Sequence, residues 1–342
     1  MSTLSPRTED RFRIPGVDQW ASRVGLGGAA TGGHGWGARD DDAAVAAIRA
    51  AAEAGITFFD TADVYGLGLA ERLLRLGLDQ IPGALERSVI ATKGGVRWDD
   101  HGRTVRDSSP THLAAAAEAS LRRLGVECIP LYYLHWQDGK TPLEDSIGAL
   151  VRLREQGKVR AVGVSNVLPA ELRVLASARI AAVQVKGNLL EPDEAFAVAE
   201  AAQAIGAVVI CSSALADGLL SGAIGLGRVF DQDDHRRRYP LFQPGAFEEA
   251  LRRVEIARGH ADALGRSVAQ VALRWLLDCG SADAVLCGAK RPEQLTDNAG
   301  ALGWSLPPDR LHALARGVPM STGSAFKRWR EADTRRARRP AS

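Results

Sequence analysis

Four residues of types suited to proton transfer, Asp60, Tyr65, Lys93 and His135, each follow a short apolar run with the character of a β-strand. The runs cover residues 55–59, 89–92 and 131–134, and Tyr65 lies in the loop just after Asp60. In a parallel barrel all strands end at the same rim, so side chains far apart in the chain converge there. The spacing therefore predicts one polar site at such a rim.

Together the four groups suit the movement of a proton to or from a carbonyl oxygen. A tyrosine hydroxyl has a reference pKa near ~10, and the neighbouring ammonium of Lys93 is expected to lower it. The Asp60 carboxylate would keep that ammonium charged and oriented, and the His135 imidazole would hydrogen-bond the carbonyl oxygen. Such a set stabilises the alkoxide that develops when hydride reaches a carbonyl carbon.

Strand-like and helix-like segments, which must position these residues, alternate along most of the chain. Apolar runs typical of strands buried on both faces lie at 24–26, 57–59, 89–92, 129–134, 159–164, 182–185, 207–211 and 284–287. Helical patterns rich in Ala and Leu lie at 40–54, 69–78, 110–124, 142–156, 169–178, 193–205, 245–264 and 268–277. The number of strands is the one that a closed (β/α)8 barrel requires.

An open doubly wound sheet would also fit this alternation, and an early glycine fingerprint would favour it. The run Gly25-Leu26-Gly27-Gly28 matches that fingerprint only in part, and no helix follows it at once. The glycine-rich residues 32–37 are better interpreted as a rim loop. We therefore predict the α/β class and a single TIM-barrel domain at 21–302, with an N-terminal extension at 1–20 and a C-terminal loop and tail at 303–342.

Composition excludes several kinds of partner. The 43 Lys and Arg residues nearly balance the 41 Asp and Glu residues, so no overall field favours nucleic acid or an anionic membrane. No apolar run approaches the ~18 residues of a membrane span, and the polar start lacks a signal-peptide pattern. The cysteines and histidines show no metal-ligand spacing. We expect a cytoplasmic protein, monomeric or homo-oligomeric, with a small-molecule substrate, no metal, and neither nucleic acid nor membrane as a partner.

Two regions depart from the alternation. Residues 222–244 form a long polar insert after the seventh strand and contain His235-Arg236-Arg237-Arg238. Loops of this length are usually lids or disordered segments. Residues 327–339 carry many arginines and few apolar side chains, which predicts a mobile basic tail. Solvation of that tail and binding of an anion or partner both stay open.

Several motifs, in order along the chain, resemble signatures of the aldo-keto reductase family. They are Gly55-Ile56-Thr57-Phe58-Phe59-Asp60-Thr61-Ala62-Asp63-Val64-Tyr65-Gly66 with Glu71, Leu134-His135-Trp136, the stretch 157–166 ending in Ser165-Asn166, and Gln294-Leu295-Thr296-Asp297-Asn298. The resemblance extends from about residue 24 to residue 302. The combination is highly specific because each motif falls at its expected strand end.

The resemblance implies that NADP or NAD binds in an extended pose across the carboxyl-terminal rim and exchanges hydride directly with a carbonyl carbon. Tyr65 would be the general acid in reduction and the general base in oxidation, tuned by Lys93 and Asp60, while His135 orients the carbonyl. We therefore predict an NAD(P)-dependent carbonyl reductase or alcohol dehydrogenase acting on a small carbonyl, a sugar or a biosynthetic ketone. A non-catalytic NADP-binding regulatory subunit and a cofactor-assisted epimerase are the alternatives.

The resemblance also implies cofactor contacts, with Ser165, Asn166 and Gln184 at the nicotinamide carboxamide. The expected cofactor residues are Ser165, Asn166, Gln184, Ser212, Ser213, Leu215, Gly218, Gly288, Lys290, Gln294, Asp297 and Asn298. Lys290 or Arg291 is suited to pair with a 2′-phosphate, because cationic donors bind phosphate oxygens well. This favours NADP, with NAD as the second choice.

Around the nicotinamide, the chain departs from the family pattern. Ser212 stands where an aromatic often stacks on the nicotinamide, and Ala214 replaces a proline in the pyrophosphate loop. Gly187 replaces a tyrosine, and Ala223 replaces a lysine. We therefore expect a divergent, wider nicotinamide pocket suited to a bulky or unusual substrate. The expected walls of the substrate pocket are Trp36, Trp98 and Trp136.

Overall fold

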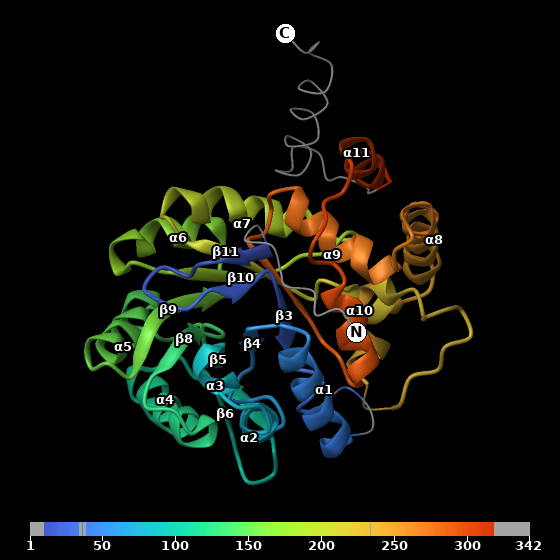
Figure 1. Ribbon diagram of the computed structural model, residues 1–342. Coiled ribbons are helices and arrows are strands. Elements are labelled where there is room, and N and C mark those ends of the chain that lie inside the picture. The colour runs from blue at the N-terminus through green and yellow to red at the C-terminus, as the bar shows by residue number, and fades with distance from the viewer. Residues whose placement is uncertain (1–9, 34–35, 37–38, 233, 318–342) are drawn as a thin grey trace.

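Eight parallel strands close into a barrel in the computed structural model, which describes residues 10–33, 36, 39–232 and 234–317 (Figure 1). In order around the barrel they are β3 (Val24–Gly27), β4 (Phe58–Asp60), β5 (Val89–Gly94), β8 (Ile129–Leu134), β9 (Val159–Ser165), β10 (Ala182–Lys186), β11 (Val208–Ser212) and β12 (Ala284–Cys287). β12 pairs with β3 and closes the ring. Each strand overlaps a predicted one, so the predicted (β/α)8 barrel is confirmed.

Helices connect the strands and cover the outside of the barrel (Figure 1). Those that the sequence predicts are α1 (Asp41–Glu53), α2 (Leu69–Asp79), α4 (Pro110–Leu124), α5 (Leu143–Glu155), α6 (Pro169–Val174) with η2 (Leu175–Ala178), α7 (Asp193–Ala204), α8 (Ala246–Leu264) and α9 (Val268–Asp278). Asp40, Ser109 and Ser267 start α1, α4 and α9, because each side chain accepts a hydrogen bond from a first-turn N–H. Within the described ranges, no helix is both long and apolar enough to cross a membrane.

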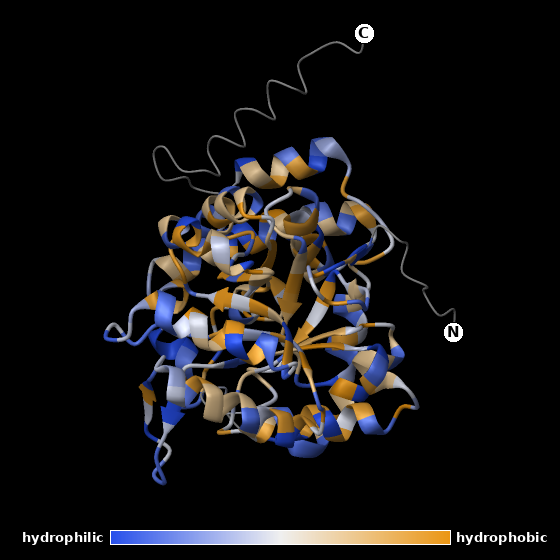
Figure 2. Ribbon diagram, turned by 90° about the vertical axis from the view of Figure 1, so that its left-hand side faces the viewer, coloured by the Kyte–Doolittle hydropathy of each residue, from blue (hydrophilic) through white to orange (hydrophobic). Residues whose placement is uncertain are grey.

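Burial on both faces explains why the strand sequences do not alternate between apolar and polar residues. One apolar cluster, which includes Phe58, Leu131 and Tyr133, fills the interior of the barrel. A second cluster lies between the strands and the helices and includes the adjacent residues Phe59 and Tyr132. Successive strand residues point to opposite faces, so one short run serves both clusters. Figure 2 shows this pattern as largely orange strands inside helices of mixed colour.

Several elements have no counterpart in the prediction. They are the antiparallel pair β6 (Val96–Trp98) and β7 (Thr104–Arg106), and the short helices α3 (Ala84–Arg87), α10 (Pro292–Ala299) and α11 (Pro308–Arg316). α11 lies where we expected a C-terminal loop. It packs on α8 and α9, and the indole N–H of Trp275 donates to the Leu311 carbonyl at 3.3 Å. Such short helices owe their stability to tertiary packing, which sequence periodicity does not reveal.

The insert at 222–244 is only partly irregular, because it contains the 3-10 helices η4 (His235–Arg238) and η5 (Pro240–Phe242). Asp234 starts η4 by accepting the N–H of Arg236 at 3.0 Å, and it also pairs with the guanidinium of Arg236 at 2.5 Å. The Tyr239 hydroxyl donates to Glu191 Oε2 at 3.1 Å, which ties the insert to the loop after β10. The basic stretch at 327–339 lies outside the described residues.

A short hairpin precedes the first barrel strand and packs against the amino-terminal end of the barrel. It consists of β1 (Arg11–Phe12) and β2 (Ala21–Ser22), within and next to the segment that we assigned to an extension. Phe12 is buried, and its ring makes an edge-to-face contact with Phe58 at 5.6 Å between centroids. Ile14 and Val17 belong to the same cluster as the barrel interior. These apolar side chains therefore cover the floor of the core, opposite the rim that carries Lys93.

Phe12→Ala tests this role of the hairpin. Phe12 is 8% exposed, and truncating a buried phenylalanine leaves a cavity that typically costs about 3 kcal/mol or more. We expect urea denaturation to show a free energy of unfolding lower by about that amount. Val105→Ala in β7, where the side chain is 51% exposed, is the control and should change the free energy little. Equal unfolding midpoints for Phe12→Ala and the native chain would contradict the proposed floor.

Candidate active site

A buried ion pair between Lys93 and Asp60 lies at the carboxyl-terminal rim of two neighbouring strands. Asp60 is the last residue of β4, and Lys93 is the penultimate residue of β5. The Lys93 ammonium donates to Asp60 Oδ1 at 2.5 Å and to the Thr61 carbonyl at 2.8 Å. Lys93 is fully buried and Asp60 nearly so. Both are therefore fixed by bonds within the barrel, as their strand-end positions predict.

The second oxygen of Asp60 is held from the far side of the barrel. Gln184 on β10 donates its amide N–H to Asp60 Oδ2 at 2.8 Å. β10 lies four strands away from β4 around the ring, so this bond crosses the interior. Burial raises the pKa of the Asp60 carboxyl, while Lys93 and Gln184 oppose that shift by stabilising its charge.

Tyr65 and His135 complete the four-residue group. The Lys93 ammonium lies 5.2 Å from the centroid of the Tyr65 ring. The rings of Tyr65 and His135 are 5.7 Å apart and nearly perpendicular. Tyr65 is partly exposed, whereas His135 is buried and its backbone N–H donates to the Gly94 carbonyl at 2.8 Å. The structure thus brings the four residues together, and Tyr65 is the one of the four that is partly exposed.

Burial decides the protonation of Tyr65 and Lys93 in different ways. The pKa of Tyr65 is raised, because desolvation of the phenolate and the charge of Asp60 outweigh the stabilising effect of Lys93. Lys93 does lower this pKa, as we expected, but burial of the phenol outweighs its effect. Burial also opposes the charge of Lys93, but Asp60 and Tyr65 beside it raise the pKa of the ammonium overall. Lys93 thus stays charged and Tyr65 stays protonated near neutral pH.

The His135 imidazole is neutral near pH 7. Burial, and then the positive charges of Lys93 and Arg106, hold its pKa well below the ordinary value. Its Nδ1 atom is buried and has no hydrogen-bond partner among the described residues. A neutral imidazole carries one N–H, which is the form that can donate to a carbonyl oxygen without competing for a proton.

A second buried network, which sequence reasoning did not assign a role, supports β5 from its outer face. Glu71 accepts from the Thr92 hydroxyl at 2.6 Å and pairs with Arg123 at 2.5 Å. Asp63 lies nearby, and burial, followed by the charge of Glu71, raises its pKa to about 8. The network joins α2 and α4 to the strand residue that precedes Lys93. Glu71 and Asp63 belong to the motif around Tyr65, which was the only sequence signal for them.

Three of the predicted cofactor residues meet beside this group. Ser165 and Gln184 are register partners on β9 and β10. Asn166 has a positive φ of 55° and donates its side-chain N–H to the His135 carbonyl at 3.0 Å and to Ser165 Oγ at 3.1 Å. The Ser165 hydroxyl thereby accepts one bond and keeps its own proton to donate. This set of donors and acceptors fits a carboxamide such as that of nicotinamide.

The loop after β11 has a backbone suited to an anion. Ser213, Ala216 and Asp217 have φ values of 51°, 49° and 52°, and Gly218 has a φ of 101°. Left-handed residues within a turn tilt neighbouring N–H groups towards one point, which makes anion-binding concavities. Leu215 is partly buried in this loop, and Ser212 precedes it with its hydroxyl donating to the Val185 carbonyl at 3.3 Å. The geometry fits the predicted pyrophosphate loop.

The residues predicted at the adenosine end are largely engaged in the fold. Gln294 Oε1 accepts from the backbone N–H groups of Lys290 at 2.8 Å and Arg291 at 3.2 Å. Asp297 accepts from Ser267 and Gln270 on α9, and Asn298 is buried. The Lys290 ammonium donates to the Trp36 carbonyl. Gly288 and Arg291 are exposed at this end, and Lys290 is half-buried. Gly288 also has room for a Cβ.

The three predicted pocket tryptophans do not share one wall. Trp136 lies beside His135 in a stacked arrangement with 6.3 Å between ring centroids. Trp36 instead meets the ring of His235 in the insert at 4.3 Å. Trp98 is the last residue of β6, in the hairpin that follows β5. Of the three, Trp136 is therefore the one in ring contact with the four-residue group.

Gly187 does not open the space that we expected. A Cβ at this position would lie 2.7 Å from the Ala195 Cβ and 2.8 Å from the Cys211 sulfur. Both distances are shorter than packed side chains allow. Close packing of α7 and β11 thus fills the space of the missing side chain at Gly187.

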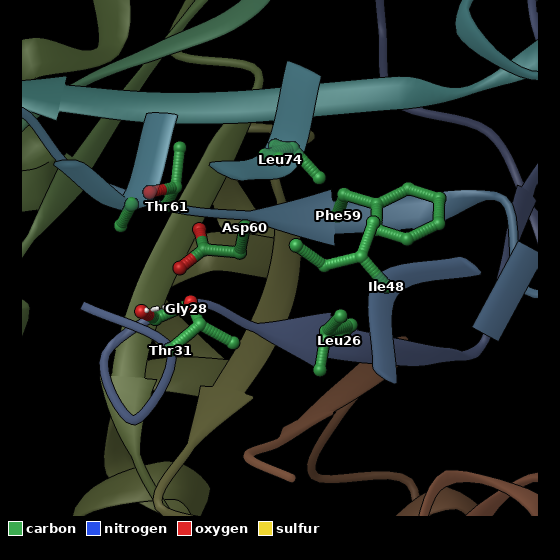
Figure 3. Close-up of a pocket in the computed structure, with 9 residues that line it drawn as sticks. Leu26, Gly28, Thr31, Ile48, Phe59, Asp60, Thr61 and Leu74 are labelled. Atoms are coloured by element: carbon green, nitrogen blue, oxygen red, sulfur yellow. Dashed lines mark hydrogen bonds between the residues drawn. The ribbon is translucent and has the colours of Figure 1, made fainter. Parts of the chain in front are cut away.

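A small cavity of about 10 Å³ lies behind Asp60, between β3, β4, α1 and α2. Figure 3 shows Asp60, Thr61, Gly28 and Thr31 at one end of it and the apolar side chains of Leu26, Ile48 and Phe59 at the other. The Thr31 hydroxyl is already bonded to the Gly28 carbonyl at 2.7 Å. The lining of the cavity includes Asp60 but neither Tyr65 nor His135, so the cavity adjoins the four-residue group only through Asp60.

Known proteins resemble this chain over nearly all of the described barrel. The profile of the Aldo/keto reductase family matches residues 23–316. Aldo-keto reductase YhdN of Bacillus subtilis is 34% identical over 84% of this chain and 86% of its own. Aldo-keto reductase yakc [NADP(+)] of Schizosaccharomyces pombe is 32% identical over 78% of this chain and 80% of its own.

Solved structures give the same result. The glycerol dehydrogenase AKR11B4 of Gluconobacter oxydans superposes with a TM-score of 0.83 and 37% identity over 92% of this chain and 99% of its own. Aldo-keto reductase AKR11C1 of Bacillus halodurans, at 22% identity and a TM-score of 0.74 over 91% of this chain and 97% of its own, shares the fold. The chain therefore belongs to the aldo-keto reductase family, whose members are nicotinamide-dependent oxidoreductases that act on small carbonyl compounds.

Proposed function

We propose that this enzyme reduces a small aldehyde or ketone with NADPH and that Tyr65 donates the proton. The observation that supports this most directly is the arrangement of Tyr65 beside both the buried Lys93 ammonium and the neutral His135 imidazole, with Tyr65 as the partly exposed member. When bound, NADPH supplies the hydride. Ser165, Asn166 and Gln184 would hold its carboxamide.

The residues of the chain account for the proton and the charge. His135 donates a hydrogen bond to the carbonyl oxygen and orients it. As hydride adds to the carbonyl carbon, the electron pair of the C=O bond moves to oxygen, which takes the hydroxyl proton of Tyr65. Lys93 stabilises the resulting phenolate, and Asp60 keeps Lys93 charged and in place. Because Tyr65 is partly exposed, solvent restores its proton.

The protonated state of Tyr65 is compatible with its proposed role as the proton donor in reduction. A raised pKa keeps the phenol protonated near neutral pH, which is the state that a proton donor requires. Oxidation would need the phenolate. The intact contacts among the four groups give no reason to prefer a non-catalytic NADP-binding subunit or a cofactor-assisted epimerase.

For the substrate we propose a small, hydroxylated carbonyl compound or the corresponding alcohol. The support is the 37% identity and near-complete coverage of a chain described as a glycerol dehydrogenase. Small polyols and their carbonyl products need few contacts, and His135 with Trp136 beside it provides a polar group next to an apolar face.

For the cofactor we propose NADP over NAD. Lys290 and Arg291 lie together at the start of α10, at the end where the family resemblance places adenosine. Lys290 makes no ion pair with a carboxylate in the described part of the chain. Burial, and then the charge of Arg236, lower the pKa of its ammonium, and a bound phosphate would oppose that shift. One relative carries NADP(+) in its name, which agrees with this choice.

Tyr65→Phe should lower kcat by about 10²- to 10⁴-fold, because it removes the proton donor and leaves the ring. The dissociation constant for NADPH, measured by fluorescence titration, should change little. Tyr239→Phe removes a hydroxyl from the insert instead and is the matched control, with kcat near that of the native enzyme. Native turnover in Tyr65→Phe would refute the assigned role.

His135→Gln should make the free energy of unfolding depend less on pH. The pKa of His135 is depressed in the folded chain, so below about pH 6.5 the unfolded chain binds a proton that the folded chain does not. Stability therefore falls as the pH decreases from 7.5 to 5.5, and His135 contributes about 1 kcal/mol to that fall.

Urea denaturation at the two pH values measures this contribution. The difference in free energy of unfolding between them should be smaller by about 1 kcal/mol in His135→Gln than in the native chain. His101→Gln, at an exposed position in the β6–β7 turn, should leave the difference as it is. An unchanged difference in His135→Gln would mean that His135 takes up a proton in the folded chain.

Lys290→Ala and Arg291→Ala test the choice of cofactor. If either side chain binds the 2′-phosphate, its loss should raise KM for NADPH by about tenfold or more and leave KM for NADH unchanged. Lys158→Ala, at the opposite end of the barrel at the start of β9, should affect neither constant. Equal increases for both cofactors would show that the residue does not distinguish them.

A further inference from the structure

The hairpin formed by β6 and β7 carries three arginines, and one of them differs from the other two. Arg97 faces Asp107 at 3.4 Å, and Arg103 pairs with Asp99 at 2.6 Å. Arg106 at the end of β7 makes no ion pair with any residue that the structure describes. The hairpin therefore presents one cation whose charge is not balanced by a neighbouring carboxylate.

Arg106 is placed over the ring that borders the reactive group. Its guanidinium carbon lies 4.0 Å from the centroid of the Trp136 ring. Trp136 in turn stacks beside His135, with an angle of 29° between the two rings. The hairpin is anchored to the end of β5, because the Asp107 N–H donates to the Gly95 carbonyl at 3.0 Å. Arg106 thus contacts Trp136, which in turn contacts His135, the residue proposed to orient the carbonyl.

The positive charge of Arg106 acts on the His135 imidazole. It is one of the positive charges that keep the His135 imidazole neutral. Arg106 itself is exposed, so it lies between solvent and the buried ring of His135. A negatively charged group that entered beside Trp136 would therefore be attracted first by Arg106 among the cations of the hairpin.

A general tendency of arginine to stack on tryptophan does not by itself explain why Arg106 lies beside the site. Arg13 lies over Trp20 and Arg266 over Trp304 at 4.6 and 4.9 Å, so arginine–tryptophan contacts occur elsewhere on the surface. Only the Arg106 contact, of these three, adjoins His135. A guanidinium at stacking distance contacts the ring through its face, and this leaves the N–H groups along its edge to bind an acceptor.

We propose that Arg106 is a specificity-determining residue that binds an anionic group, a carboxylate or a phosphate, on the carbonyl substrate. The inference rests on the proposed carbonyl reduction at Tyr65. With the carbonyl oxygen on Tyr65 and His135, the anionic group extends along the face of Trp136 to the guanidinium. Arginine binds both kinds of oxyanion through two parallel N–H bonds, which gives direction as well as attraction.

A pair of aldehydes of matched shape tests the proposal. 4-Carboxybenzaldehyde carries a carboxylate where 4-nitrobenzaldehyde carries a neutral nitro group of similar size. The quantity to measure is the ratio of kcat/KM for the two aldehydes with NADPH, in the native enzyme, Arg106→Gln and Arg103→Gln. Arg103 lies on the same hairpin and has the same charge, but Asp99 already balances it, so it is the matched control.

In Arg106→Gln we expect the ratio of carboxy- to nitro-aldehyde to fall about tenfold or more, since a charged hydrogen bond is lost. The fall should come from KM, because the bond forms equally in the bound substrate and the transition state. Turnover of 4-nitrobenzaldehyde should persist, which shows that the variant folds. Arg103→Gln should keep the native ratio.

A ratio in Arg106→Gln within twofold of the native value would overturn the proposal, as would an equal fall in Arg103→Gln. Failure of the native enzyme to reduce either aldehyde would instead refute the proposed function. In that case calorimetric binding of the two aldehydes to the NADPH-loaded proteins still tests Arg106. Loss of the carboxylate preference in Arg106→Gln supports it, and an unchanged preference overturns it.

Discussion

The ion pair between Lys93 and Asp60 is the interaction on which the rest of the site depends. Placing two charges in the interior of a barrel is costly unless every bond they need is made there. Here Asp60 receives Lys93 on one oxygen and Gln184 on the other, and Lys93 also donates to the Thr61 carbonyl. These bonds join β4, β5 and β10 across the interior. These bonds fix the position of Lys93 and Asp60 at the carboxyl-terminal rim, where we propose that the chemistry occurs.

The same pair sets the electrostatics around Tyr65. Because Asp60 balances much of the charge of Lys93, the phenol does not experience a free ammonium, and burial then keeps it protonated. His135 experiences the remaining positive field and stays neutral. The result is a protonated donor beside an uncharged hydrogen-bonding imidazole, which is the combination that carbonyl reduction requires.

The loops above the carboxyl-terminal rim lie on two sides of the site. In barrels of this kind the loops at this rim carry the function. On one side the β6–β7 hairpin brings Arg106 over Trp136, next to His135. On the other side the insert after β11 brings His235 against Trp36, near the loop whose left-handed residues suit a pyrophosphate. In our proposal the first side binds the substrate and the second binds the cofactor. Each loop is attached to a strand end, so both can vary without disturbing the buried pair.

The sequence by itself determined the eight strands, the helices between them and the meeting of Asp60, Tyr65, Lys93 and His135. These follow from local periodicity and from the rule that parallel strands end at one rim. Only the tertiary structure decided the raised pKa of Tyr65, the packing that fills Gly187 and the position of Arg106. Desolvation, close contact and unbalanced charge depend on neighbours from distant parts of the chain. No spacing along the sequence reports them.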